Sequence, residues 1–400
     1  MSLSSGLGVY IHIPYCLQRC TYCDFATYVH TEIKPPEHYV ELVKKEIALR
    51  HGLFANQKST PLKTIYFGGG TPSLIPAELI VELISELAKF GYQTGPQTEI
   101  TIEINPATVD ERKLEVYLKA GINRFSVGAQ TFSNRLLKMV HREHNAQQTK
   151  DTLALLRKYD LNFSFDVLFA LPTQTLDELR YDVDVAVELG SKHISPYCLT
   201  VPEGHPLSKN RPLEDDQIEM FNIIHEQLLK NQFARYEISN YAKAGFESRH
   251  NLLYWTDENY WGLGLSAHAY QKNTSLVNDW GARFWNANNF KNYEKDILSA
   301  TEISSIANYP ADQKELLKKH QSLTDFCHTA LRLSAGLRLQ NLQDKFGISA
   351  LHHIQKIAEP LTLHNVVELK DSAYRLTDKG VLISNQVFEK FTFLESEFQS

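Results

Sequence analysis

Three cysteines stand close together near the start of the chain, in the stretch YIHIPYCLQRCTYCDF. Cys16, Cys20 and Cys23 fall within eight positions of a 400-residue sequence that has 5 cysteines in all. A disulfide framework uses cysteines in pairs, and a structural zinc site takes four ligands. A C-x3-C-x2-C loop can instead place three thiolates around a cuboidal 4Fe–4S cluster, which leaves the fourth iron open to a small chelating molecule.

Two other interpretations of the cysteines remain open. A disulfide with one spare thiol is possible, but a reducing compartment disfavours it. A zinc ion completed by His12 or Asp24 is also possible, although zinc loops usually combine one close cysteine pair with a distant second pair. The spacing therefore favours the open cluster.

A glycine-rich turn, FGGGTPSL, occupies residues 67–74. Taken alone it is equally typical of a tight turn between a strand and a helix. Its functional interpretation is that glycines let backbone groups approach a ligand closely. The turn leaves the carboxyl end of a predicted strand, and the cysteine loop leaves another predicted strand at the same end. Parallel α/β folds keep their sites at that edge, so the two signals converge.

Short apolar strands alternate with helical stretches over the first half of the chain. We expect strands at 8–14, 64–70, 98–105, 124–130, 163–172 and 193–200. This alternation predicts an α/β fold with a parallel sheet. Six units over about 200 residues predict a partial (β/α)6 barrel of the TIM type, because a closed eight-unit barrel needs about 250 residues. An open doubly wound sheet remains the alternative, since strand order is not readable from the sequence.

The chain divides into three expected regions. Residues 1–232 form the (β/α)6 core with the cluster, and 233–308 form an extension that carries an H-N-x-x-Y-W motif in RHNLLYW (249–255). Within that extension, residues 234–242 read as one further strand. Residues 309–400 form a small helical, winged-helix-like domain with a hairpin in VVELKDSAYRLTDKG.

Composition excludes several classes of function. The formal net charge is -6, whereas non-specific nucleic-acid binding needs a basic face. No apolar run approaches the ~20 residues of a transmembrane helix. The opening MSLSSGLG lacks the basic and apolar segments of a signal peptide. We therefore expect a cytoplasmic protein without a transmembrane segment.

Several motifs, in order along the chain, resemble one branch of the radical S-adenosylmethionine (SAM) superfamily. They are YIHIPYCLQRCTYCDF, YFGGGTPSL, IEINPATV, GINRFSVGAQTF, DVLFALPTQT and RHNLLYW. The branch contains oxygen-independent coproporphyrinogen III dehydrogenase and the haem chaperones called HemW. The resemblance runs from about residue 8 to the last forty residues of the chain.

The resemblance implies a role for each matching residue. Cys16, Cys20 and Cys23 would hold a 4Fe–4S cluster, with SAM chelating the open iron. The guanidinium of Arg142 would grip the SAM carboxylate, a pairing that suits its bidentate geometry. The full set of implied SAM contacts is Tyr10, Tyr22, Gly69, Gly70, Thr71, Glu103, Gln130, Arg142 and Asp166. Any of the charged residues taken singly would be interpreted as a solvated surface residue.

Two features distinguish members of the branch. The dehydrogenase pattern has a further cysteine where this chain has Phe25, and a longer segment before the first strand. Both differences favour the haem-chaperone side. There the resemblance implies that His250 of the H-N-x-x-Y-W motif is an axial haem ligand, since a neutral imidazole binds iron. Without the resemblance, a structural histidine is the better interpretation.

Three functions therefore stand as expectations. The first is a haem chaperone that binds a 4Fe–4S cluster, SAM and haem. Its expected partners are recipient apo-haemoproteins and an electron donor such as a flavodoxin or ferredoxin. The second is coproporphyrinogen III dehydrogenase, and the third is a zinc-binding structural protein. The first two share a core able to cleave SAM reductively, and whether the chain is an enzyme stays open.

Overall fold

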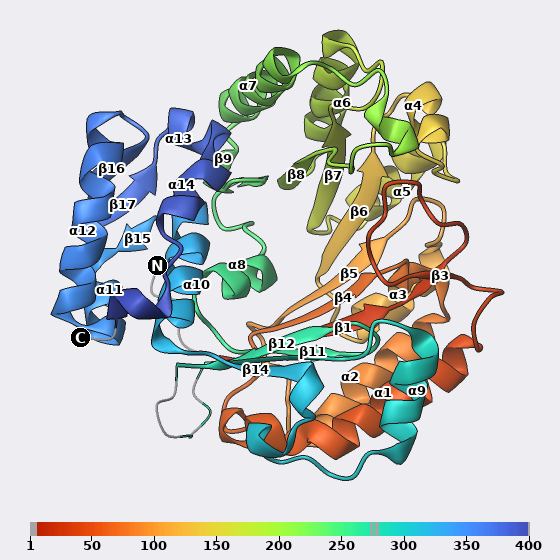
Figure 1. Ribbon diagram of the computed structural model, residues 1–400. Helices are drawn as coiled ribbons and strands as arrows, with labels where there is room; N and C mark the ends of the chain where they lie inside the picture. The colour runs from red at the N-terminus through yellow and green to blue at the C-terminus, as the bar shows by residue number, and fades with distance from the viewer. Residues whose placement is uncertain (1–5, 273, 275, 277–279, 399–400) are drawn as a thin grey trace.

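A curved 12-stranded sheet is the main element of the computed structural model, which describes residues 6–272, 274, 276 and 280–398 (Figure 1). Its central six strands are parallel and follow one another in chain order. They are β1 (Gly8–Ile13), β4 (Thr64–Gly69), β5 (Glu99–Ile104), β6 (Arg124–Gln130), β7 (Phe163–Phe169) and β8 (His193–Cys198). All six strands were predicted. Sequential order is that of a partial barrel, so the doubly wound alternative is wrong.

Helices cover the outer face of this sheet (Figure 1). They are α1 (Pro36–Arg50), α2 (Ala77–Lys89), α3 (Glu111–Lys119), α4 (Asn134–Met139), α5 (Ala146–Lys158), α6 (Leu176–Glu188) and α7 (Glu214–Lys230). In α2, Leu79, Ile80, Leu83 and Leu87 recur at helical spacing and are buried, so one stripe of the helix packs on the sheet. The helices carry the chain back from the carboxyl end of one strand to the start of the next. The carboxyl ends of the parallel strands therefore lie together at one edge of the sheet.

Successive side chains of the strands point to opposite faces of the sheet. In β6, Phe125, Val127 and Ala129 belong to the main hydrophobic core. The alternate residues Arg124, Ser126, Gly128 and Gln130 line a cavity on the inner face. The other inner strands follow the same rule with Glu103, Asp166, His193 and Ser195. The barrel interior is therefore polar, and the apolar core lies between the sheet and its helices.

Residues 233–308 extend this sheet at both edges. The segment predicted as one strand at 234–242 is a hairpin, with β9 (Ala234–Glu237) antiparallel to β10 (Asn240–Ala242). At the other edge, β11 (Tyr260–Leu263) pairs in parallel with β1. Beyond it lie β12 (His268–Gln271) and β13 (Ala282–Trp285), and β14 (Lys314–Leu316), which follows residues 233–308 in the chain, forms the edge of the sheet. Helices α8 (Arg249–Trp255) and α9 (Phe290–Ser299) belong to the same segment, which shares its core with the barrel.

The C-terminal residues form a second unit with its own core, which includes Leu323, Leu331, Leu342 and Ile354. Its helices are α10 (Lys319–Arg332), α11 (Leu339–Phe346), α12 (Ile348–Leu363), α13 (Asp378–Leu382) and α14 (Ser384–Lys390). Strands β15 (Leu337–Arg338), β16 (Val367–Lys370) and β17 (Ala373–Leu376) form a small antiparallel sheet. The predicted hairpin is β16–β17. Helix α10 contacts α8, which lies between the sheet and this unit (Figure 1).

Across the described residues, no helix combines the length and the apolarity needed to traverse a bilayer.

Candidate functional site

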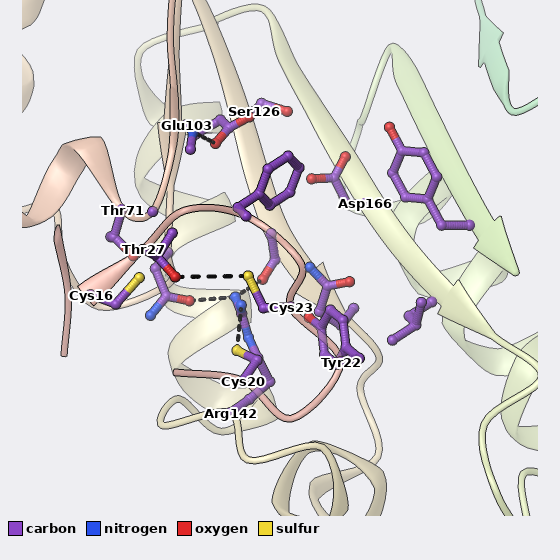
Figure 2. Close-up of a pocket in the computed structure, with 18 of the residues that line it drawn as sticks. Cys16, Cys20, Tyr22, Cys23, Thr27, Thr71, Glu103, Ser126, Arg142 and Asp166 are labelled. Carbon is purple, nitrogen blue, oxygen red and sulfur yellow. Dashed lines mark hydrogen bonds between the residues drawn. The ribbon is translucent and has the colours of Figure 1, made fainter. Parts of the chain in front are cut away.

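A cavity of about 480 Å³ opens at the carboxyl ends of the parallel strands and continues down the barrel interior (Figure 2). The cysteine loop lies at its mouth, and Arg124, His193 and Asn251 lie at its far end. The residues from the sequence analysis that line it are Cys16, Cys20, Tyr22, Cys23, Gly69, Gly70, Thr71, Glu103, Gln130, Arg142 and Asp166. Segments far apart in the sequence therefore converge on one space.

The cysteine loop is closed by two short strands. β2 (Tyr15–Cys16) pairs in parallel with β3 (Tyr28–Val29). Within the loop, the Cys23 N–H donates to the Cys20 carbonyl at 3.2 Å. All five cysteines of the chain are free thiols. The loop thus presents three thiols to the cavity from a base that is tied to the first strand.

The three thiols offer the donor chemistry of a cluster, in which each thiolate binds its own iron. Among the described residues, no group of three or more histidine, cysteine or acidic side chains is arranged to hold one metal ion. A mononuclear zinc site needs such a compact group, whereas each thiolate of a cuboidal cluster binds a different iron, so its sulfurs stand farther apart. Figure 2 shows Cys20 next to Arg142, and Cys23 next to Thr27 at 4.0 Å.

The glycine turn is bound directly to the strand that carries the first cysteine. Gly70 N–H donates to the Ile13 carbonyl at 2.9 Å, and Thr71 N–H donates to the Tyr15 carbonyl at 2.7 Å. Gly69 has φ 111°, and a Cβ there would lie 2.4 Å from the His12 ring. Only glycine tolerates that conformation and that approach. The turn therefore fixes the position of the cysteine segment and also forms one wall of the cavity.

Arg142 lies beside Cys20, inside the cavity wall. Its Nη1 donates to the Cys20 sulfur at 3.5 Å, and its Nη2 donates to the Asn105 side chain and the Gly128 carbonyl. Burial opposes its charge, but Tyr22 and Cys20 hold the pKa of Arg142 above its ordinary value. A cation at this point is placed to bind the carboxylate of a molecule that chelates the open iron.

Two carboxyl groups lie in the middle of the cavity. Glu103 accepts hydrogen bonds from the Tyr66 hydroxyl at 2.8 Å and from the Gly69 N–H at 3.1 Å. Burial raises the pKa of Glu103 to about 7 and that of Asp166 to about 6. A cationic ligand between them would favour their ionised forms, because opposite charges stabilise one another at low dielectric.

Tyr10 and His250 are not among the residues that line this cavity. The Tyr10 hydroxyl lies 3.0 Å from His12 Nδ1, and its ring stacks on Tyr66. Tyr10 therefore packs on the inner face of the sheet against Tyr66, which lines the cavity.

His250 is 1% exposed and both of its ring nitrogens have partners. Its Nδ1 lies 2.6 Å from Thr64 Oγ1, and its Nε2 lies 2.8 Å from the Tyr254 hydroxyl. Burial lowers the pKa of His250 to about 3, so the ring is neutral. The Glu99 carboxylate accepts the His250 backbone N–H at the start of α8. In this arrangement His250 anchors α8, and iron ligation would require that helix to move.

Comparison with known protein families gives two matches. The model of the radical SAM superfamily matches residues 10–186, and that of the HemN C-terminal domain matches residues 317–383. A curated relative from Lactococcus lactis, named heme chaperone HemW, is 31% identical over 400 residues and covers 98% of each chain. The Escherichia coli HemW is 36% identical over 267 residues, covering 66% of this chain and 69% of its own.

The chain belongs to the HemW family. Its match to the radical SAM superfamily implies a 4Fe–4S cluster and SAM as cofactors. A solved structure of Escherichia coli coproporphyrinogen III oxidase, HemN, has the same fold, with a TM-score of 0.79. That match covers 97% of this chain and 90% of the other at 19% identity. The predicted α/β radical SAM fold with a C-terminal domain is thus confirmed.

The lining residues of this HemW-family cavity that our prediction did not include are numerous, and Arg124, His193 and Asn251 are among them. The sequence feature that could have identified Arg124 and His193 is the alternation of inward and outward side chains along a strand. Arg124 shares its strand face with the predicted Gln130, and His193 opens a strand whose alternate residues are also polar. Asn251 follows the motif histidine directly, but only the orientation of α8 shows that it, rather than His250, lines the cavity.

Replacing Thr64 by valine is expected to destabilise the protein by about 1–3 kcal/mol, because it leaves a buried ring nitrogen of His250 without its partner. Valine keeps the shape of the side chain, so little packing is lost. Denaturant unfolding followed by circular dichroism measures the change. Thr60→Val is the control, since Thr60 is an exposed threonine. Equal stability of the two variants would contradict an anchoring role for His250.

Proposed function

We propose that this protein is a haem chaperone that binds haem, a 4Fe–4S cluster and SAM and passes haem to recipient apo-haemoproteins. The observation that carries the proposal is similarity over 98% of both chains to a protein named heme chaperone HemW. The site supports it, since the cysteine loop, the glycine turn and Arg142 meet at one cavity. Free cysteines suit a reducing cytoplasm, where a flavodoxin or ferredoxin can supply electrons.

In this proposal the chain's residues divide the work of holding the cofactors. Cys16, Cys20 and Cys23 ligate the cluster, and Arg142 binds the SAM carboxylate. Reduced cluster and SAM together supply one-electron chemistry when bound. The remaining proposed SAM contacts are Tyr10, Tyr22, Gly69, Gly70, Thr71, Glu103, Gln130 and Asp166, of which Tyr10 acts through Tyr66, on which its ring stacks.

Phe25 supports the chaperone over the dehydrogenase. Its side chain stands at the position of the dehydrogenase's further cysteine and is 62% exposed beside the cavity mouth. Phenylalanine offers no thiolate there. A large exposed apolar ring next to the cysteine loop instead suits contact with a hydrophobic macrocycle.

Haem ligation by His250 stays part of the proposal, with a condition set by the geometry. The imidazole must leave Thr64 or Tyr254 before a nitrogen can bind iron. Helix α8 has only 7 residues and lies against the C-terminal unit. Haem would therefore select a conformation in which α8 is released.

Haem titration of the anaerobic protein tests this proposal. We expect His250→Ala to lose the Soret shift of the wild type while it keeps the cluster iron. Thr64→Val is expected to raise haem affinity a few-fold, because it loosens the contact that holds the ring closed. If Thr64→Val lowers haem affinity as His250→Ala does, His250 acts only by positioning α8.

A transfer assay separates the chaperone from the dehydrogenase. We expect haem-loaded wild type to reconstitute an added apo-haemoprotein and to leave coproporphyrinogen III unconverted when SAM and reductant are present. Conversion of coproporphyrinogen III to protoporphyrinogen IX without haem binding would establish the enzyme instead.

A further inference from the structure

The far end of the cavity, opposite the cysteines, is built from buried polar groups. Arg124 is the first residue of β6 and is 2% exposed, and His193 is the first residue of β8 and is 1% exposed. Asn251 reaches the same end from α8. We call these three residues the cavity floor.

Arg124 has a buried guanidinium that the protein leaves unpaired. Among the described residues its side chain has no salt bridge or hydrogen-bond partner, and its Nε is fully buried. The nearby acids make no ion pair with Arg124: Glu103 accepts hydrogen bonds from Tyr66 and Gly69, and burial raises the pKa of Glu103 and Asp166 while the Arg124 charge acts against that rise. A buried, unpaired cation is unfavourable for folding. Such a group is therefore matched to an anion that arrives with a ligand.

His193 adds a second unpaired group at the floor. Its Nε2 lies 2.8 Å from the Tyr236 hydroxyl, whereas its buried Nδ1 has no partner among the described residues. Burial lowers the pKa of His193 well below its ordinary value, so the ring is neutral. When the Tyr236 hydroxyl donates to Nε2, Nδ1 carries the proton and is a donor. Arg124 and His193 together then offer donors for a carboxylate.

The carboxylate of SAM is not the anion that fits here. Arg142, which we assign to that carboxylate, contacts Cys20 and the Gly128 carbonyl near the cavity mouth. Arg124 begins the same strand four residues earlier, which places it about 13 Å along the strand from Gly128. One SAM molecule cannot chelate a cluster at the mouth and put the same carboxylate on the floor.

We infer that Arg124, with His193, forms a carboxylate-binding site that takes a propionate of haem. The inference rests on the proposed haem-chaperone function and names the part of haem that the barrel recognises. Asn251 is adjacent to His250 in the H-N-x-x-Y-W motif, and Arg124 lies close enough to His250 for its charge to lower the pKa of that ring. Haem that displaces α8 would thus meet the motif histidine together with Arg124 and His193, which stay on β6 and β8 when Asn251 moves with the helix.

Haem and haem dimethyl ester are the probes that test the site, because esterification removes both propionate charges. We expect wild type to bind haem about tenfold more tightly than the ester, in line with a hydrogen bond to a charged group. Arg124→Gln should bind haem about tenfold more weakly and bind the ester as wild type does. Arg124→Lys should keep part of the preference. Arg135→Gln, at an exposed ion pair with Glu178, should leave both affinities unchanged.

Thermal unfolding of the ligand-free variants completes the test. Arg124→Gln should unfold at the wild-type temperature or above, because it removes an unpaired buried charge. A lower unfolding temperature would make Arg124 a structural residue and overturn the inference. Two other results for Arg124→Gln would also overturn the inference. One is an equal loss of affinity for haem and for the ester. The other is a lower affinity for SAM with the preference for haem over the ester retained. Wild type that binds haem and ester equally refutes this site alone, whereas wild type that binds neither refutes the chaperone proposal as well.

Discussion

Replacing Cys20 by alanine is expected to remove the iron–sulfur cluster completely. Anaerobically purified wild type should contain about four irons per chain, and the variant should contain almost none. With Cys20 gone, only two thiolates remain on the loop, and Arg142 loses the sulfur beside it. Iron and sulfide analysis, together with the visible absorption spectrum after reconstitution, measures the loss.

Cys198→Ala is the matched control for the cluster prediction. Cys198 is a free, exposed cysteine that lines the same cavity from the end of β8, outside the cysteine loop. We expect its replacement to leave the iron content unchanged. Stoichiometric zinc in wild type, with no brown colour after reconstitution, would contradict the cluster and support the zinc-site interpretation.

Replacing Arg142 by glutamine is expected to weaken SAM binding by roughly thirtyfold to a hundredfold, toward the upper range for hydrogen bonds to charged groups. The variant loses the cation next to Cys20 and leaves the Asn105 side chain and the Gly128 carbonyl without their donor. Equilibrium binding of SAM to the reconstituted protein measures the effect. Iron content should stay at the wild-type value, because Arg142 donates to a thiolate without ligating iron.

Arg135→Gln is the control for the SAM prediction, since Arg135 is exposed and paired with Glu178. Its SAM affinity should equal that of wild type. Unchanged SAM affinity in Arg142→Gln would show that another residue holds the carboxylate.

Local sequence determined the strands and the cysteine site. Few residues separate Cys16, Cys20 and Cys23, so all three lie on one loop. Their convergence at one site therefore follows from their closeness in the sequence. The six parallel strands were readable because apolar runs and helical periodicity are properties of short windows. Asp110 shows the same locality: its side chain accepts the Lys113 N–H at the start of α3, as a capping residue does.

Tertiary structure decided everything that depends on which strands are neighbours and which way a helix faces. Strand order is set by long-range pairing, so the choice of a partial barrel over a doubly wound sheet lay beyond any local pattern. The interpretation of RHNLLYW also depended on the tertiary structure. A histidine and the asparagine after it differ by about 100° around a helix, and only the docking of α8 buries His250 against Thr64 while Asn251 lines the cavity. Whether Arg124 is paired was likewise decided in three dimensions, because its potential partners come from other strands.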